Sequence, residues 1–386
     1  MADFLPYGSQ WLDEEDIQSV VDVLNGDWLT TGPTVDGFEE AIAEETDAEH
    51  AVAVNSGTAA LHAAYEAVGV GPGTNVIVPS LTFSATANAA RYLGAEVRFA
   101  DVDKTLTMDP ASAEALVDGD TRVIAPVDFA GHPARLDELS ELADEAGAAL
   151  VEDAAHSIGG RFEGRPLGSV ADITCFSFHP VKTITSGEGG AAVTDSEEWA
   201  HRMKQFRSHG QDYDVDRFLD DDQPGGWIYD IHEPGFNYRI TDMQCALGLS
   251  QLEKLDRFVD RRQEIAGCYR ELFDDQTHVE MPPEKDWAHH AYHLFPIRVP
   301  AEHRKAIFAE LRNRDIGVQV HYIPVNSLSY YRELGHDPEN TPRALEEYRR
   351  LISIPCFPKM ADEDIQRAAD TVIDVVGQIA GENSRE

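Results

Sequence analysis

Short apolar runs alternate with amphipathic stretches between residues 51 and 195. The runs have the length and composition of buried strands: Ala51–Val54, Val76–Val78, Val97–Ala100, Val123–Val127 and Ala149–Val151. Between them, apolar residues recur at helical spacing in Thr58–Val68, Ser84–Tyr92 and Leu136–Ala146. Strand–helix alternation of this kind predicts an α/β fold with a large, mostly parallel sheet and helices on both of its faces.

The pattern changes after Ser196, where helices dominate. Thr241–Arg262 is predicted as one helix that begins with a T-x-x-Q capping box, and 217–226 is predicted as a solvated loop. Beyond residue 285 the alternation returns, with strands at His293–Arg298, Val318–His321 and Leu351–Ile354 and helices at 302–313 and 361–378. We therefore expect a large domain over 1–260 and a smaller C-terminal α/β domain over 261–386.

The charge of the chain is strongly negative. Its 70 acidic residues outnumber 31 basic ones, which gives a formal net charge of −39, and only seven of the basic residues are lysines. Such a surface repels nucleic acid and anionic membranes. The acidic residues are spread along the whole chain, which is typical of a protein from a high-salt organism, because salt screens their mutual repulsion.

The four cysteines lie far apart and form no CxxC pair, which favours a reducing cytoplasm over a disulfide framework or a zinc ribbon. The first ten residues lack the pattern of a signal peptide, and no apolar run reaches the length of a membrane span. We expect a cytoplasmic protein.

Three segments carry candidate chemistry. The first, Asn55-Ser56-Gly57-Thr58-Ala59, follows a predicted strand and opens a predicted helix. Free N–H groups and the helix dipole at such a position can bind a phosphate, and Ser56 and Thr58 add hydroxyl groups. A simple helix N-cap is the alternative interpretation.

In the second segment, Asp153 and His156 stand just past the carboxyl end of a buried strand, where open α/β sheets bind their ligands. A carboxylate there can hold a proton on a pyridine nitrogen, and the histidine can reach a substituent of that ring. Alternatively, Asp153 caps a turn.

The third segment places Lys182 in an apolar turn after the predicted strand Ile173–Phe178 and before the glycine-rich stretch 186–190. Lysine is scarce in this chain and avoids burial, so its presence there requires a reason. A Schiff base removes its charge; an exposed turn lysine is the alternative. Glu188 could be a general base, although the lysine itself is the simpler proton carrier.

A single chemistry needs all three segments. A phosphate cradle, a carboxylate for a pyridinium nitrogen and a lysine for an aldehyde are the groups that bind pyridoxal 5'-phosphate (PLP). Their order along consecutive strand–helix units suits the fold-type I PLP-dependent transferases.

The chain resembles the DegT/StrS family of PLP-dependent nucleotide-sugar aminotransferases over nearly its whole length. The matching segments are Gly32-Pro33, Ser56-Gly57-Thr58-Ala59-Ala60-Leu61, Thr82-Phe83, Phe99-Ala100-Asp101-Val102-Asp103, Glu152-Asp153-Ala154-Ala155-His156, Ser177-Phe178-His179-Pro180-Val181-Lys182 and Asn237-Tyr238-Arg239-Ile240-Thr241-Asp242.

The resemblance implies a role for each matching residue. Lys182 would carry PLP as a Schiff base, Asp153 would pair with the pyridinium nitrogen, and His156 would approach the ring hydroxyl. Phe83 would stack on the ring. Thr58, Ala59 and Ser177 would bind the phosphate, and Asn237 would reach the phosphate of the neighbouring subunit, which implies a homodimer with shared active sites.

A finer resemblance, to a subgroup of the pseudaminic acid pathway, is carried by Pro6-Tyr7-Gly8, Val127-Asp128-Phe129-Ala130-Gly131, Ala246-Leu247-Gly248-Leu249-Ser250-Gln251-Leu252 and Val320-His321-Tyr322-Ile323-Pro324. It implies transfer of an amino group from L-glutamate to C4 of a UDP-linked 4-keto-6-deoxy sugar for glycan biosynthesis. Tyr7, Arg239 and His321 are then the candidate substrate contacts.

Other functions remain to be weighed. A PLP-dependent sugar dehydratase would carry histidine in place of Lys182, and an aminotransferase for a 3-keto, dTDP-linked or GDP-linked sugar would share much of this sequence. A non-catalytic protein on the same fold would not need all three segments, and an NAD-dependent dehydrogenase would need a glycine fingerprint that is absent. We expect no metal site at 289–293, since His290 and His293 would lie on opposite faces of a predicted strand.

Overall fold

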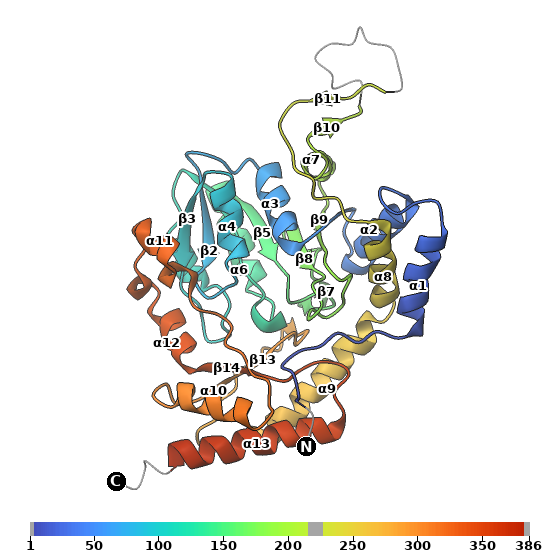
Figure 1. Ribbon diagram of the computed structural model, residues 1–386. Coiled ribbons are helices and arrows are strands. Elements are labelled where there is room, and N and C mark those ends of the chain that lie inside the picture. The colour runs from blue at the N-terminus through green and yellow to red at the C-terminus, as the bar shows by residue number, and fades with distance from the viewer. Residues whose placement is uncertain (1–3, 215–226, 382–386) are drawn as a thin grey trace.

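The computed structural model describes residues 4–214 and 227–381, and its centre is a seven-stranded sheet (Figure 1). The spatial order is β1-β9-β8-β5-β4-β2-β3. All pairs from β3 to β8 are parallel, whereas β9 runs antiparallel to both β8 and β1. The strands are β1 His50–Val54, β2 Asn75–Pro79, β3 Glu96–Ala100, β4 Thr121–Ile124, β5 Ala149–Asp153, β8 Ile173–Ser177 and β9 Gly190–Thr194. The predicted fold class is confirmed.

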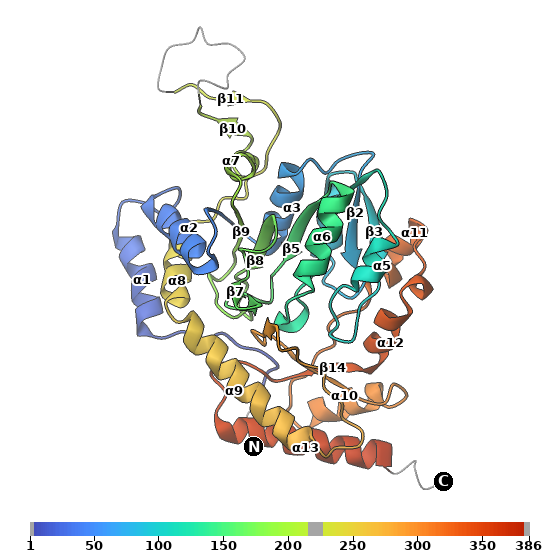
Figure 2. The same ribbon diagram turned by 180° about the vertical axis from the view of Figure 1, so that it is seen from behind.

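Helices cover both faces of the sheet. Figure 1 shows α3 (Gly57–Ala67) and α4 (Ala85–Tyr92) in front of the strands, and Figure 2 shows α5 (Pro110–Glu114) and α6 (Leu136–Ala146) in front of the opposite face. Each face has its own buried apolar cluster, one beneath α3 and α4 and one beneath α5 and α6. The sheet is therefore apolar on both faces, which explains why its strands read as continuous apolar runs.

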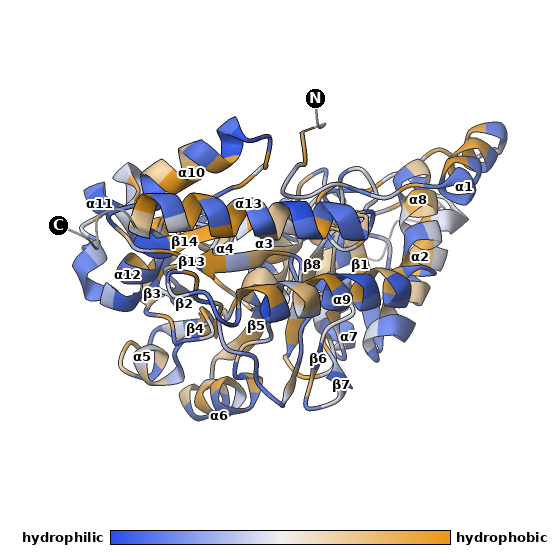
Figure 3. Ribbon diagram, turned by 90° about the horizontal axis from the view of Figure 1, so that it is seen from below, coloured by the Kyte–Doolittle hydropathy of each residue, from blue (hydrophilic) through white to orange (hydrophobic). Residues whose placement is uncertain are grey.

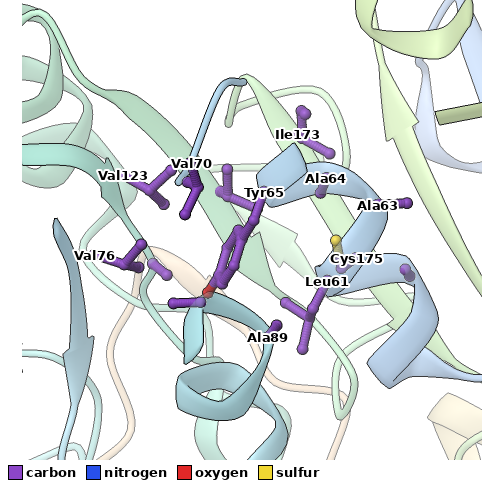
Figure 4. Close-up of a cluster of buried hydrophobic side chains, with 14 of the residues drawn as sticks. Leu61, Ala63, Ala64, Tyr65, Val70, Val76, Ala89, Val123, Ile173 and Cys175 are labelled. Carbon is purple, nitrogen blue, oxygen red and sulfur yellow. The ribbon is translucent and has the colours of Figure 1, made fainter. Parts of the chain in front are cut away.

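The cluster beneath α3 is drawn in Figure 4. Tyr65 points from α3 toward the strands, and Val76, Val123 and Ile173 lie around it. Burial of each large apolar side chain of this kind contributes about 2 kcal/mol to folding. This packing fixes α3 against the face of the sheet.

The predicted helix Thr241–Arg262 is wrong in one respect: the structure has two helices, α8 (Asp242–Leu252) and α9 (Leu255–Phe273). The predicted capping box of Thr241 and Gln244 is confirmed at the start of α8. The helices separate at Lys254, which has a non-helical backbone conformation. Its ammonium group lies 2.5 Å from Asp13 and 3.0 Å from Asp16, and these long-range ion pairs hold the break in place.

The C-terminal region packs around the second half of α9, with α10 (Arg304–Asn313), α13 (Asp362–Gly381) and the strand pair β13 (Phe295–Arg298) and β14 (Leu351–Ile354). Figure 3 shows hydrophilic and hydrophobic positions alternating along α13, whose apolar side enters this core. The first half of α9 packs instead beneath β1 and β9. Since α9 contributes to both cores, the predicted division at residue 260 falls within one helix.

Two other predicted strands are wrong. Val318–His321 makes only an isolated bridge, between Gln319 and Ser353, because the chain turns away toward the cavity described below. The histidine-rich segment forms only β12 (Ala288–His289), since Tyr292 adopts a left-handed conformation with φ of 48° that breaks strand alternation.

The remaining elements surround these layers. They are α1 Glu14–Asn25, α2 Pro33–Thr46, β6 Arg161–Phe162, β7 Arg165–Pro166, α7 Glu197–Phe206, β10 Gln211–Asp212, β11 Asp230–Ile231, α11 Ser329–Glu333 and α12 Pro342–Arg350. The predicted loop 217–226 lies outside the described residues. Within the described residues, no helix combines the length and apolar character needed to cross a bilayer.

Candidate active site

The three segments singled out in the sequence meet at one cavity of about 330 Å³, at the ends of β5 and β8 and the start of α3. We call this the inner cavity. Its walls include eight residues predicted to act in cofactor or substrate binding: Tyr7, Thr58, Phe83, Asp153, His156, Ser177, Lys182 and His321.

The start of α3 is built to approach β8 closely. Ser56 is the N-cap, and its hydroxyl accepts a hydrogen bond of 3.1 Å from the backbone N–H of Ala59. A Cβ on Gly57 would lie only 2.9 Å from the Cβ of Ser177. Glycine therefore allows the first turn of α3, with its free N–H groups, to stand beside the Ser177 hydroxyl, an arrangement suited to a phosphate.

Asp153, at the end of β5, is buried. Its carboxylate accepts a hydrogen bond of 2.7 Å from the Thr86 hydroxyl and one of 3.2 Å from the backbone N–H of Ala155. Burial raises the pKa of Asp153, while these two hydrogen bonds and the charge of Lys182 oppose that shift. A carboxylate held in this way can pair with a protonated ring nitrogen.

A hydrogen-bonded chain supports this carboxylate from the apolar core. The hydroxyl of Tyr65 donates to the backbone carbonyl of Thr86 over 3.1 Å, and the hydroxyls of Thr82 and Thr86 lie 3.0 Å apart. These two contacts hold Thr86 so that its hydroxyl faces Asp153.

Lys182 lies in the turn between β8 and β9 and is partly buried. The backbone N–H of Lys182 donates to the carbonyl of His179 over 2.9 Å, which closes the turn. Burial lowers the pKa of its ammonium group to about 8, and the charge of Asp153 limits the shift. An amine with this pKa is partly neutral near pH 7 and can attack an aldehyde.

His156 is a neutral hydrogen-bond donor toward the cavity. Its Nδ1 accepts a hydrogen bond of 3.2 Å from the backbone N–H of Ala130, so the proton of the neutral ring lies on Nε2. Burial and the charge of Lys182 hold its pKa well below the ordinary value. Nε2 stands 3.2 Å from the hydroxyl of Tyr322, which is therefore the acceptor.

Three predicted residues do not line the inner cavity. Ala59 contributes its backbone N–H to the N-cap, one residue from Thr58. Asn237 is exposed, and its backbone carbonyl accepts a hydrogen bond from the Asn55 side chain over 3.4 Å. Arg239 also lies outside the walls of the cavity.

Other residues of the site carried no role in the sequence. Thr86 holds Asp153, Tyr322 contacts His156, and the buried ring of His293 lies 4.5 Å from that of His156. No spacing rule marks Thr86 or His293, whereas Tyr322 belongs to a segment already noted for its family resemblance. Across residues 4–214 and 227–381, no group of three or more His, Cys, Asp or Glu side chains is arranged to hold a metal ion.

The residues present fit PLP. The start of α3 with Ser177 matches the phosphate, Asp153 matches the ring nitrogen, and Lys182 matches the aldehyde, and all of them face one cavity. The exposed ring of Phe83, whose side of the cavity adjoins Tyr322, offers an aromatic surface for the ring face.

Comparisons with known proteins show the family of the chain. The model of the DegT/DnrJ/EryC1/StrS aminotransferase family matches residues 10–373. A Campylobacter jejuni protein named UDP-4-amino-4,6-dideoxy-N-acetyl-beta-L-altrosamine transaminase is 38% identical over 381 residues, covering 97% of this chain and 98% of its own.

Solved structures share the whole fold. Helicobacter pylori PseC, an aminotransferase involved in the biosynthesis of pseudoaminic acid, superposes with a TM-score of 0.91 at 30% identity, covering 97% of this chain and 100% of its own. The PLP form of Streptococcus pneumoniae Spr1654 gives the same TM-score and identity, covering 97% of this chain and 99% of its own. The chain belongs to the DegT/DnrJ/EryC1/StrS aminotransferase family and is a PLP-dependent sugar aminotransferase.

Proposed function

We propose that the enzyme transfers an amino group from L-glutamate to C4 of a UDP-linked 4-keto-6-deoxy sugar, for amino-sugar biosynthesis. The observation that carries the proposal is the joint placement of Lys182, Asp153 and the phosphate cradle on one cavity. The similarity to the Campylobacter jejuni transaminase and to PseC supports the choice of sugar. A dehydratase is not favoured, since Lys182 is present and points to amino transfer.

PLP, when bound, supplies an aldehyde that joins to an amine and a ring that accepts electrons from the bond that breaks. The protein positions these groups. Asp153 would hold a proton on the ring nitrogen, and His156 would approach the ring oxygen. The Nζ of Lys182, with a pKa of about 8, can both take up and return a proton near neutral pH.

We also propose that two copies of the chain share their active sites. Asn237 and Arg239 match family segments yet lie outside the inner cavity of their own chain, and Asn237 is exposed. A polar side chain in this position can serve the phosphate of a second copy.

Helix α1 offers an apolar surface for that second copy. Ile17, Val21 and Leu24 recur at helical spacing on α1 and are exposed, with 55% of Leu24 accessible, and Trp28, just beyond the helix, is exposed as well. A stripe of this kind on a chain with a net charge of −39 favours burial against a partner.

Mixing experiments test the shared sites. Lys182→Arg and Asn237→Ala homodimers should each be nearly inactive, because each site lacks either its lysine or the partner's amide. Heterodimers formed by mixing them contain one intact site, so activity should return. No recovery on mixing, with subunit exchange verified by mass, would contradict the sharing.

The substrate is tested with purified enzyme and L-glutamate, incubated with a panel of UDP-linked and dTDP-linked keto-sugars and read by mass spectrometry. We expect a 4-amino sugar from the UDP-4-keto-6-deoxy compound, with 2-oxoglutarate in equal amount. Loss of a hydroxyl without consumption of glutamate would instead identify a dehydratase.

We further propose that the enzyme works in the cytoplasm of a high-salt organism. The net charge of −39 and four free cysteines, of which Cys268 is exposed, support this habitat. Added salt should raise the melting temperature by screening acidic repulsion. A melting temperature that falls steadily between 0.1 and 2 M KCl would count against it.

A further inference from the structure

Two buried carboxyl groups that take no part in the chemistry described above meet behind the inner cavity. Asp128 follows β4, Glu152 lies on β5 one residue before Asp153, and the side chains of Asp128 and Glu152 are both buried. Their carboxyl groups are hydrogen-bonded to each other. Two ionised carboxylates offer only acceptors and repel each other, so this contact requires a proton between them.

The other hydrogen bonds of the pair place that proton on Glu152. Both oxygens of Asp128 already accept: Oδ1 from the backbone N–H of Ala134 over 2.9 Å and Oδ2 from the Ser157 hydroxyl over 2.6 Å. Glu152 Oε2 accepts from the Thr174 hydroxyl over 2.7 Å, whereas its Oε1 is buried and receives no hydrogen bond from the described residues. A proton on Oε1 gives this atom a partner, because it can donate to Asp128. Burial and the charge of Asp128 raise the pKa of Glu152 well above its ordinary value, which agrees with this placement.

Asp128 joins the two segments that surround His156. On one side its carboxylate holds the hydroxyl of Ser157, the residue after His156. On the other side it holds the backbone N–H of Ala134, and its own backbone carbonyl accepts a hydrogen bond of 3.0 Å from the N–H of Gly131. The residues between 128 and 134 therefore form a closed loop against the turn that carries His156.

This loop brings a backbone N–H to the ring of His156. Ala130 lies in the loop with a left-handed conformation, φ of 61°, which is unfavourable for alanine. Its N–H donates to Nδ1 of His156 over 3.2 Å and so keeps the proton of the neutral ring on Nε2, the nitrogen beside Tyr322. Without the support of Asp128, Ala130 could relax and leave Nδ1 free to carry the proton instead.

We propose that Asp128 is a positioning residue for amino transfer: with a proton-bearing Glu152 beside it, it fixes His156 in the tautomer that carries its proton on Nε2. The inference rests on the proposed function, in which His156 approaches the ring oxygen of the cofactor. Neither carboxyl belongs to the wall of the inner cavity, so both act through other residues.

Infrared spectroscopy of the full chain, with and without PLP, tests where the proton lies. A protonated carboxyl group gives a carbonyl band that a carboxylate lacks. At neutral pH the unmodified protein should show this band, and Glu152→Gln should lose it. Glu310→Gln is the control, because Arg314 lowers the pKa of Glu310 and keeps it ionised, so the band should remain. Absence of the band from the unmodified protein, or the same band in Glu152→Gln, would overturn the proposal.

NMR of the protein with isotope-labelled histidine reads the tautomer of His156, whose signals are identified by their loss in His156→Gln. Asp128→Asn replaces an acceptor oxygen by an NH₂ group, so it should yield a mixture of both tautomers and slow the glutamate half-reaction of the PLP-loaded enzyme about tenfold. In Glu152→Gln the amide still donates to Asp128, so the proton should stay on Nε2.

A matched pair of variants covers the case in which Asp128→Asn does not fold. Ser157→Ala removes a hydroxyl that donates to Asp128, and Thr174→Val removes one that donates to Glu152. Only Ser157→Ala should populate the second tautomer. The Nε2 tautomer alone in Ser157→Ala and in any folded Asp128→Asn would contradict the proposal, even if both variants lost stability.

A failure of the proposed function looks different from a failure of this inference. The unmodified enzyme would then show no half-reaction with L-glutamate. The position of the proton and the tautomer of His156 are measured on the protein without PLP as well, so they do not depend on that reaction.

Discussion

The inner cavity adjoins a second cavity of about 350 Å³, the outer cavity, which is otherwise lined by Ser84 and the segment 319–328. The two cavities share Tyr7, Thr82, Phe83, His321 and Tyr322 and differ in the rest of their walls. The inner wall carries Lys182, Asp153 and His156, each held by strand ends or hydrogen bonds and each with a shifted pKa. The outer wall is uncharged and is formed largely by a segment without regular strand structure. The difference leads us to expect that changes to the inner wall alter the chemical steps and that changes to the outer wall alter affinity for a substrate.

The largest effect is expected for Lys182→Arg, because the guanidinium group neither joins an aldehyde nor releases a proton near neutral pH. Turnover should fall about 10³-fold or more. The visible absorption band of the bound cofactor should change with it. Lys204→Arg, on an exposed lysine, is the control and should retain both. If Lys182→Arg retained turnover, Lys182 would not be the residue that carries the chemistry of the inner cavity.

Asp153→Asn should lower turnover about 10- to 100-fold, since a charge-assisted hydrogen bond contributes about 1.5–3 kcal/mol. The control is Glu152→Gln, one residue earlier on β5. Burial and the neighbouring Asp128 raise the pKa of Glu152 well above its ordinary value, so glutamine imitates its protonated form. If Asp153→Asn and Glu152→Gln lowered the steady-state rate equally, the effect would not be specific to the carboxylate that faces the inner cavity.

The pH dependence of cofactor capture probes the same wall. The amine of Lys182 is protonated below its pKa and reactive above it, and burial lowers this pKa from 10.5 to about 8. Capture of added PLP by the apoprotein, followed by stopped-flow absorbance, should accelerate about tenfold between pH 7 and pH 9 and then level off. A rate that still climbs steeply above pH 10 would indicate an unshifted lysine.

Thr86→Val tests the support behind Asp153. It removes the 2.7 Å hydrogen bond to that carboxylate, and should cost about 1–2 kcal/mol of stability and lower turnover severalfold. Thr174→Val is the matched control, because it removes a hydrogen bond of the same length, 2.7 Å, to Glu152, the residue before Asp153. Denaturant unfolding should show similar losses of stability for the two variants, while only Thr86→Val slows turnover.

The smallest effect belongs to the outer wall. Ser353→Ala removes the hydroxyl that orients His321 and should raise KM for the keto-sugar about two- to tenfold. The half-reaction with glutamate should proceed at the original rate. A slower half-reaction with glutamate and an unchanged KM for the keto-sugar would instead assign His321 to the chemical steps.

The sequence was most informative where chemistry sits at the ends of consecutive strands. Asp153 and Lys182 could be placed from local patterns, because the carboxyl ends of the parallel strands that precede them meet at one edge of the sheet. Tyr7 and His321 depended on family resemblance, since their approach to Lys182 joins segments more than a hundred residues apart.

Other features depend on tertiary contacts and could not be predicted from the sequence. The outer cavity joins Phe83 and Ser84 to the segment 319–328, and no local pattern predicts that packing. Similarly, the apolar periodicity of 241–262 indicated one helix, but the helix breaks at Lys254, whose ammonium group pairs with Asp13 and Asp16 from a distant part of the chain. The role of Asn237 and the domain division at residue 260 stay predictions.

The ion pairs of Lys254 bear on the high-salt habitat that we propose. Dissolved ions weaken attractions between charges on the surface, but the ammonium of Lys254 and the carboxylate of Asp16 are 8% and 1% exposed and lie beyond their reach. The anchoring of α1 to the rest of the chain therefore persists at salt concentrations that erase exposed ion pairs. At high salt, the helix that we expect to meet a second copy would therefore keep its attachment to the rest of the chain.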